Sequence, residues 1–251
     1  MEPRTLAYFV SDVHLGLDYK DPEDRERRFV EFLRSIPAER TAALYMLGDI
    51  WDFWYEYRDV VPKGYVRVFA ALLDLQDAGV KIYFMPGNHD IWSYSYFREL
   101  GFTVIDQPYV TEIGGVTLCL VHGDGLGPVG YGYRFMNSMF KWRPLQVLFS
   151  MLHPWIAFRL GNGWSKSNRT GKHAGPYVFK GEKEPLYRWA EDFSRGTHVD
   201  CFIAGHYHAA YDGTLPSGSR LLVMKDWFDG VSYSYLDGMT VRLGISMNTE
   251  K

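Results

Sequence analysis

Five short polar segments, each placed directly after an apolar run, constrain the fold of this chain more than any other feature. The segments are Asp12-Val13-His14, Gly48-Asp49-Ile50-Trp51-Asp52, Gly87-Asn88-His89-Asp90, His122-Gly123-Asp124 and Gly205-His206-Tyr207-His208. Short apolar runs rich in β-branched and aromatic residues are typical of buried strands. Ligand sites in α/β sheets gather beyond the carboxyl ends of strands, so segments that are distant in sequence can meet in one crevice. The pattern therefore predicts an α/β fold with one polar site built from several strand ends.

The remaining sequence alternates strand-like and helix-like segments. The predicted strands cover residues 6–10, 42–47, 80–85, 104–113, 116–121, 199–204, 221–224, 231–236 and 239–243. Helical spacing of apolar residues or helix-compatible charge occupies about residues 22–36 and 65–78, between the first three strands. This order predicts strand–helix–strand crossovers, and the Gly and Asp-Gly turns between the later strands predict a second sheet.

An insertion between the fourth and fifth polar segments is predicted to form a helical cap over about residues 126–195. Its first part, Tyr131 to Leu160, is rich in aromatic and aliphatic residues punctuated by Lys141, Arg143 and Arg159. Ordinary helices packed on the core give the same apolar spacing, so both interpretations stay open. The polar stretch from Gly161 to Gly175 is predicted to be a loop. We expect one domain over residues 1–251 that carries this cap.

Composition narrows the classes of function. The formal charge of −3 provides no global cationic field, so we expect no nucleic-acid partner, and we infer no protein partner. Cys119 and Cys201 lie inside apolar runs and are expected to be core residues of a protein in the reducing cytoplasm. The sequence after Met1 lacks an apolar signal region, and no uninterrupted span is long enough to cross a bilayer, so we expect neither export nor membrane spanning. Aromatic residues make up 17% of the chain, which favours an apolar ligand surface.

The residue types in the five segments are those of a metal centre. Asp12 and His14 are two residues apart, so an extended backbone points both side chains the same way. Asp49 could bridge two cations, and the neighbouring Gly48 lets the backbone approach a ligand. Asn88 offers a neutral oxygen ligand.

Two divalent ions account for these side chains better than one. The seven candidate ligands are Asp12, His14, Asp49, Asn88, His122, His206 and His208. They exceed what a single site with an open position would use. Carboxylate and amide oxygens mixed with imidazoles, without a thiolate, suit Mn²⁺, Fe²⁺ or Zn²⁺. Two such ions ~3.5–4 Å apart can grip a phosphate and promote its hydrolysis without another cofactor.

In order and spacing, the five segments resemble the calcineurin-like metallophosphoesterase superfamily over roughly residues 6–225. The resemblance implies a two-sheet mixed β-sandwich flanked by helices. It also implies one metal held by Asp12, His14 and His208, a second held by Asn88, His122 and His206, and Asp49 as the bridge. His89 would protonate the leaving oxygen, since histidine exchanges protons near neutral pH. Asp90 would orient His89, as carboxylates do for other catalytic imidazoles.

Within the superfamily, Gly-Asp-Ile-Trp-Asp-Phe-Trp, His-Gly-Asp and the aromatic insertion are most similar to UDP-2,3-diacylglucosamine pyrophosphate hydrolases of lipid A synthesis. That family releases UMP and 2,3-diacylglucosamine 1-phosphate. The resemblance implies a cap that takes acyl chains and a cytoplasmic enzyme peripheral on the inner membrane. Basic residues that flank the apolar helices suggest the same contact with an anionic surface. The expected substrate contacts are Asn88, Ser165, Lys166, Arg169 and Lys172.

Two positions depart from the best-known branch of that family, which has arginine at His89 and usually threonine at Tyr207. Two other functions therefore stay open. One is a metallophosphoesterase for another phosphodiester or phosphomonoester, and the other is a scaffold without catalysis. Lys166, Arg169 and Lys172 could equally form a solvated face. Asp52 and Asp124 could support metal ligands or cap helices, and the sequence does not separate these roles.

Overall fold

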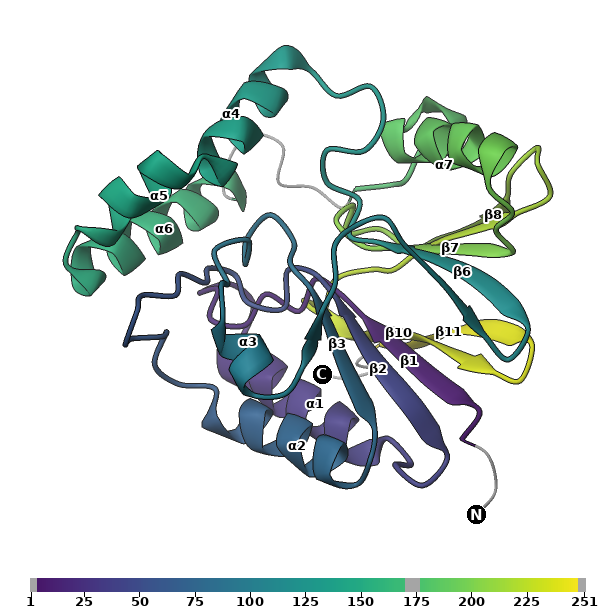
Figure 1. Ribbon diagram of the computed structural model, residues 1–251, viewed down its shortest axis with the longest axis horizontal. Helices are drawn as coiled ribbons and strands as arrows, with labels where there is room; N and C mark the ends of the chain where they lie inside the picture. Colours follow the sequence, from purple (N-terminus) through teal and green to yellow (C-terminus); the bar gives the residue numbers. More distant parts are fainter. Residues whose placement is uncertain (1–3, 170–176, 248–251) are drawn as a thin grey trace.

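Two mixed β-sheets pack face to face in the computed structural model, which describes residues 4–169 and 177–247 (Figure 1). The first sheet has the order β11 (Thr240–Met247), β10 (Gly230–Asp237), β1 (Leu6–Val10), β2 (Thr41–Leu47), β3 (Lys81–Met85) and β4 (Thr103–Val104). The second has the order β5 (Tyr109–Ile113), β6 (Val116–Val121), β7 (Cys201–Ala204), β9 (Arg220–Val223) and β8 (Tyr211–Thr214). The neighbours from β1 to β4 are parallel, as are β6, β7 and β9. The predicted α/β sandwich is confirmed.

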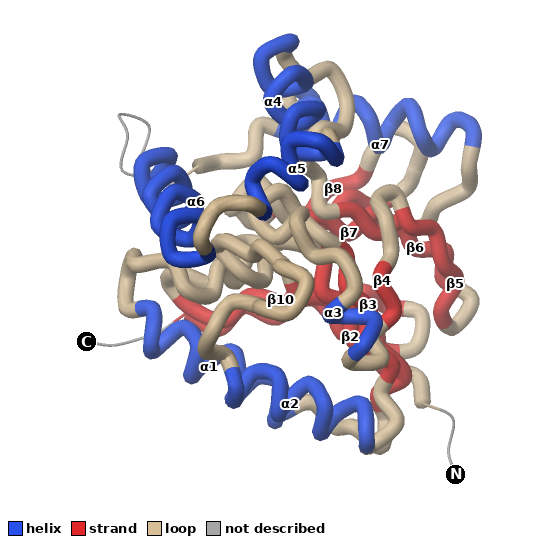
Figure 2. Tube along the Cα trace, turned by 60° about the vertical axis from the view of Figure 1, so that its left-hand side comes forward, coloured by secondary structure: helices blue, strands red, loops and turns tan. Residues whose placement is uncertain are grey.

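Seven α-helices accompany the two sheets among the described residues. They are α1 (Pro22–Ser35), α2 (Val66–Asp77), α3 (Tyr96–Glu99), α4 (Tyr131–Lys141), α5 (Arg143–Ser150), α6 (Pro154–Arg169) and α7 (Pro185–Gly196). Figure 2 shows α1 and α2 along the first sheet and α7 against the second. Asp21 begins α1 by accepting a hydrogen bond from the Asp24 amide at 3.0 Å, which satisfies one free N–H of the first turn.

The space between the sheets is filled by alternate side chains of their central strands. Phe9, Leu47, Leu118, Ile203 and Leu222 are all buried in this one cluster. Such alternation in parallel strands places the hydrophobic core against both sheets and leaves the strand ends free for polar residues. The strands that carry the five polar segments are therefore fixed by packing on both sides.

Two strand predictions were wrong in detail. The run predicted over residues 104–113 is divided into β4 and β5, which belong to different sheets. The strand β8, Tyr211-Asp-Gly-Thr214, was not predicted because its sequence carries few apolar residues. In the structure its residues alternate between half-buried and exposed. It lies at an edge of the second sheet, where one partner strand suffices.

The helices α4, α5 and α6, called the insertion helices below, stand apart from the sandwich (Figure 1). Loops after β2 and β3 reach them: Tyr55 donates a hydrogen bond to the Gln146 carbonyl at 2.7 Å, and the Trp92 indole donates one to the Phe140 carbonyl at 3.0 Å. Among the described residues, no helix is long and apolar enough to span a membrane.

The loop predicted from Gly161 to Gly175 was wrong in its first part, because α6 continues to Arg169. The glycine that suggested a loop has a packing reason instead. A Cβ on Gly161 would overlap the ring of Phe53, so the helix approaches the core closely at this point. Residues 170–175 lie outside the described residues.

Candidate metal centre

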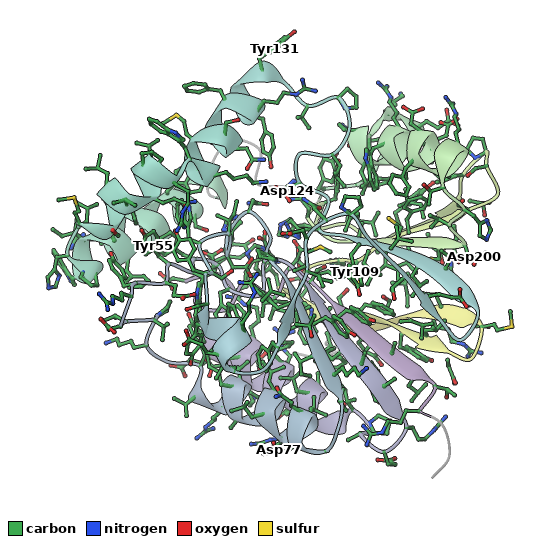
Figure 3. All side chains as sticks on the ribbon, in the orientation of Figure 1. Tyr55, Asp77, Tyr109, Asp124, Tyr131 and Asp200 are labelled. Carbon is green, nitrogen blue, oxygen red and sulfur yellow. The ribbon has the colours of Figure 1, made fainter. Side chains whose placement is uncertain are left out.

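All five polar segments meet at the carboxyl ends of their strands. Asp12 and His14 follow β1, Asp49 follows β2, Asn88 and His89 follow β3, His122 follows β6, and His206 and His208 follow β7. The residues form three groups, and within each group the potential ligand atoms lie within 4.8 Å of one another. The groups are Asp12, His14 and His208; His14, Asp49 and His89; and Asp49, His122 and His206. Asp124 follows the candidate ligand His122 by two residues and lies, in Figure 3, between the sandwich and the insertion helices.

The backbone at the cluster is held in an unusual conformation. Asp12, His14, Asp49, His206 and His208 all have positive φ, between 50° and 70°. Non-glycine residues adopt this left-handed region rarely and at a cost in free energy, and such residues concentrate at functional sites. The short turns that follow the strands therefore aim these five side chains inward at the expense of local stability.

Asp12 and Asp49 are both buried, and in each the two carboxylate oxygens have different partners. Asp12 Oδ2 accepts a hydrogen bond from the His206 amide at 2.8 Å, and Asp49 Oδ1 accepts one from the His89 amide at 2.9 Å. The other oxygens, Asp12 Oδ1 and Asp49 Oδ2, face imidazole nitrogens. Asp12 Oδ1 is buried and has no hydrogen-bond partner among the described residues. A buried carboxylate oxygen left in this state requires a cation or a proton.

Three of the imidazoles are oriented through Nδ1. His122 Nδ1 donates to the Leu47 carbonyl at 2.9 Å, while His14 Nδ1 lies 3.1 Å from Asp52 Oδ1 and His208 Nδ1 lies 3.1 Å from Asp226 Oδ2. An imidazole that donates from Nδ1 presents the lone pair of Nε2, the arrangement found in metal-binding histidines. The Nε2 atoms of all three turn toward the carboxylates of the cluster.

Distances between these atoms fit ligands that share ions. Asp12 Oδ1 lies 3.8 Å from His14 Nε2 and 3.7 Å from His208 Nε2, too far for hydrogen bonds. Asp49 Oδ2 lies 3.8 Å from His14 Nε2 and 3.4 Å from His122 Nε2, which places this oxygen between the two groups. Ligands bound ~2.0–2.2 Å from one ion are separated by such distances. The site therefore suits divalent metal ions.

The pKa values of the buried aspartate and histidines in the cluster also favour binding of cations. Burial raises the pKa of Asp49, but the charges of His122 and His89 outweigh it and hold this pKa well below its usual range. Burial, assisted by the charge of His122, lowers the pKa of His206 to about 4 and keeps this imidazole neutral. The pKa of His122 is raised well above its usual value because Asp49 outweighs the effect of burial. A metal ion would take the place of the proton that His122 holds against Asp49.

Glycines provide the clearance that the cluster requires. A Cβ on Gly87 would overlap the Asp49 carboxylate, and a Cβ on Gly205 would overlap the carboxylate of Asp12. Both glycines stand next to predicted ligands in the sequence, so close backbone approach is part of how the segments converge.

His89 and Asp90 have different surroundings. His89 Nδ1 donates to the Asp52 carbonyl at 2.7 Å, and its side chain is 13% exposed at the edge of the cluster. The Asp90 carboxylate accepts hydrogen bonds from the backbone amides of Gly87 at 2.7 Å and Ile50 at 2.9 Å. It joins the turns after β2 and β3, whereas the group beside the His89 ring is Asp52.

The structure describes the side chains of only some of the predicted substrate residues. Asn88 Oδ1 lies 3.3 Å from His122 Nε2, within the metal cluster. Ser165 is buried on α6, and its hydroxyl has no partner among the described residues. Lys166 and Arg169 belong to α6, for which the structure describes the backbone but not these two side chains. Lys172 lies outside the described residues.

Two side chains near the cluster were missed by sequence reasoning. Asp226, which supports His208, follows β9 but stands in no His- or Gly-containing motif; its position after a strand was the available signal. Tyr133 reaches Asp124 from α4, and burial together with the Asp124 charge raises the pKa of its hydroxyl. Asp52 lies 3.1 Å from His14 Nδ1, whereas Asp124 accepts a hydrogen bond from Gln107 at 2.6 Å.

Comparisons with known proteins agree with this geometry. The family model described as calcineurin-like phosphoesterase matches residues 7–210. The chain belongs to the calcineurin-like phosphoesterase family. It is 37% identical to a UDP-2,3-diacylglucosamine hydrolase of Porphyromonas gingivalis, over 96% of this chain and 97% of that protein. It is 35% identical to a protein of the same name from Neisseria gonorrhoeae, over 92% and 94% of the two chains.

A solved structure supports the calcineurin-like phosphoesterase fold. A dimetal phosphatase from Danio rerio superposes with a TM-score of 0.54 at 14% identity, covering 99% of this chain and 98% of the other. This likeness concerns the fold alone. Family membership makes the protein a metal-dependent hydrolase, and the prediction of family and enzyme class is confirmed.

Proposed function

We propose that this protein hydrolyses the pyrophosphate of UDP-2,3-diacylglucosamine to UMP and 2,3-diacylglucosamine 1-phosphate, a step of lipid A synthesis. Hydrolases named for this substrate are its relatives over nearly the whole chain. The observation that carries the proposal is a large apolar cavity whose lining includes Leu15, the residue that follows the candidate ligand His14. A substrate with a phosphate bridge and two acyl chains needs both features side by side.

The apolar cavity has a volume of about 660 Å³. It lies between the insertion helices and the core, and its lining includes Leu15, Phe53, Val60, Val61, Trp155 and Phe158. Leu15 and Gly16 of this lining directly follow the candidate ligand His14 in the chain. Pockets lined by aliphatic and aromatic side chains bind apolar ligands by excluding water from their surfaces. Acyl chains fit this mainly apolar lining, and Lys63 and Arg159 are its two cationic members.

We assign two divalent ions to the cluster, with Mn²⁺ as the proposed native metal and Fe²⁺ or Zn²⁺ as the alternatives. Asp12, His14 and His208 would hold one ion; Asn88, His122 and His206 would hold the other; and Asp49 would bridge them. The mixture of oxygen and imidazole ligands supports this set of metals. When bound, such ions supply positive charge to the phosphate oxygens and activate water for attack.

His89 is assigned the role of general acid. Its Nδ1 hydrogen is used on the Asp52 carbonyl, so the proton available for transfer is on Nε2. Water releases one proton to solvent as its oxygen forms a bond to one phosphorus; the P–O bond to the other phosphate breaks, and Nε2 gives its proton to the departing oxygen. Asp52 positions the ring. Asp90 acts indirectly, by holding the turns after β2 and β3 in place.

We also propose that the protein is one domain over residues 1–251, with residues of about 126–195 as its cap, and that it works in the cytoplasm on the inner-membrane surface. Exposed apolar side chains on or between the insertion helices support membrane contact; they include Phe135, Trp142, Leu148 and Met151. The basic residues Arg134, Lys141 and Arg143 accompany them. Apolar side chains beside cations bind anionic lipid surfaces.

A metallophosphoesterase acting on a different phosphoester is the second candidate function. The position of His89 favours it, because a histidine within 4.8 Å of the His14 and Asp49 ligand atoms can act as a general acid on many leaving groups. It would require no apolar cavity.

An assay of UMP release tests the proposal. The Mn²⁺-loaded protein is given UDP-2,3-diacylglucosamine, and bis(4-nitrophenyl) phosphate is supplied in parallel as a lipid-free ester. We expect efficient UMP release and slow ester cleavage. Cleavage of the aryl ester without UMP release would retain the metal chemistry and exclude the lipid substrate.

A further inference from the structure

A second, polar cavity adjoins the other end of the metal cluster. Its volume is about 240 Å³, and its lining includes Gly87, Ser93, Arg98, Asp106, Gln107 and Lys141. Gly87 directly precedes Asn88, and Asp124, also in the lining, follows His122 by two residues. The apolar cavity begins instead at Leu15 and Gly16, next to His14. Gly87 contacts Asp49 and His122, so the polar cavity reaches the metal cluster, and the two cavities are lined by neighbours of different candidate ligands.

The polar cavity differs from the apolar one in what it can bind. It carries two carboxylates, two cationic side chains and a serine hydroxyl, which makes it unfavourable for acyl chains because their burial would leave these polar groups unsolvated. Its size is on the scale of one sugar with a single-ring base. Carboxylates recognise the vicinal hydroxyls of ribose in nucleotide-binding proteins.

Some of its polar groups are already engaged, and others are left for a ligand. Gln107 donates to Asp124 Oδ1 at 2.6 Å and accepts from the Gly123 amide at 2.9 Å, so it is satisfied within the protein. The Ser93 hydroxyl is buried without a hydrogen-bond partner in the described part of the chain. Asp106 is exposed at the cavity and faces solvent. Buried hydroxyls are normally paired, so the Ser93 oxygen indicates an absent partner.

We infer that the polar cavity is a ribonucleoside subsite, in which Asp106 and Ser93 bind the ribose and base of a nucleotide whose phosphate lies on the metal cluster. The inference rests on the proposed function, because a nucleotide lipid has one polar and one apolar half on either side of its pyrophosphate. Lys141 from α4 closes the subsite from the insertion helices, so both halves of the substrate contact these helices.

The test compares binding of UMP and methyl phosphate to the Mn²⁺-loaded protein by calorimetry. Both ligands bring a phosphate to the metal centre, and only UMP carries a nucleoside. We expect UMP to bind at least about tenfold more tightly, and Asp106→Ala to remove about tenfold of that preference, as expected for hydrogen bonds to a charged group. Ser93→Ala should remove a smaller part, because its hydroxyl is neutral.

Matched controls separate the subsite from general effects. Asp77→Ala removes an exposed carboxylate far from Asp124 in Figure 3, and Ser232→Ala removes a buried hydroxyl on β10 that has no hydrogen-bond partner among the described residues. Neither should change the preference for UMP. Thermal unfolding of all four variants shows that each is folded.

The outcomes distinguish the subsite from the overall function. Equal affinities for UMP and methyl phosphate in the unaltered protein would refute the subsite, as would a UMP preference that survives both Asp106→Ala and Ser93→Ala. Selective UMP binding that depends on Asp106, in a protein that releases no UMP from the lipid nucleotide, would retain the subsite and refute the lipid substrate.

Discussion

The metal centre and the insertion helices are built in opposite ways. Asp12, His14 and His122 are fully buried at strand ends that packing fixes on both sides. The described side chains of α4 and α5 include none that are buried, and Tyr131 at the start of α4 is 90% exposed. Under the proposed function this contrast separates reaction from specificity: the sandwich positions the charged groups of the metal centre, and the more exposed apolar layer binds the acyl chains.

The strongest test of this division is Asp49→Ala. The change removes the oxygen that lies between the two ligand groups and leaves His14 and His122 without their common carboxylate. We expect metal binding to be lost and turnover to fall to the background of metal-free protein, for lipid and aryl substrates alike. Metal analysis by mass spectrometry measures the first effect. Asp77→Ala is the control, and an unchanged metal content in Asp49→Ala would disprove the assignment.

His89→Ala should reduce kcat by about 10²–10⁴-fold, the usual contribution of a general acid. Both metal ions should remain bound, because His89 is not among the assigned ligands. Parallel measurements of kcat and metal content check this, with His198→Ala, an exposed histidine paired with Asp200 at 3.2 Å, as the matched control. Loss of metal from His89→Ala would show that this histidine is a ligand instead.

Asp226→Ala should weaken metal affinity by about 10–100-fold, because the carboxylate orients His208 through Nδ1. Asp226→Asn keeps an oxygen that can accept this hydrogen bond and should retain more of the affinity. Titration of the metal-free variants with Mn²⁺ measures both effects. If Asp226→Ala binds Mn²⁺ as tightly as the unaltered protein, the His208 ring is held by packing alone.

The smallest effect is expected from the insertion helices. Phe158→Ala removes an aromatic ring from the apolar cavity, and we expect the ratio of kcat/KM for the lipid nucleotide to kcat/KM for the aryl ester to fall about tenfold. Tyr131→Ala, on the same set of helices but outside the lining, should leave this ratio unchanged. An equal loss on both substrates in Phe158→Ala would mean that the helices support the metal centre as well as specificity.

The same contrast explains how far the sequence could be interpreted. The α/β class and the convergence of the five segments could be predicted because each segment follows an apolar run, and sheet geometry brings strand ends together. The roles of Asp52 and Asp90 could not be separated, since both are acidic residues close to other polar residues. Asp52 contacts the imidazoles of His14 and His89, whereas the Asp90 carboxylate accepts a hydrogen bond from the Ile50 amide, and all three partners are distant in sequence.

Outside the strand ends, local patterns were weaker guides. Gly161 and the polar residues after it predicted a loop, whereas α6 continues because the glycine packs on Phe53. The edge strand β8 has little apolar character of its own, and Asp226 stands outside every recognisable motif. In each case the decisive interaction is with a residue far away in the chain.

The divided use of oxygens by Asp12 and Asp49 limits which substitutions these positions can tolerate. In each carboxylate one oxygen accepts a backbone hydrogen bond and the other faces the metal centre. Asparagine has the same shape but must turn its NH₂ group toward either a backbone donor or a cation, and both encounters are repulsive. Glutamate keeps two oxygens but displaces them by a methylene group. Neither asparagine nor glutamate can therefore replace Asp12 or Asp49 and preserve both contacts of the carboxylate.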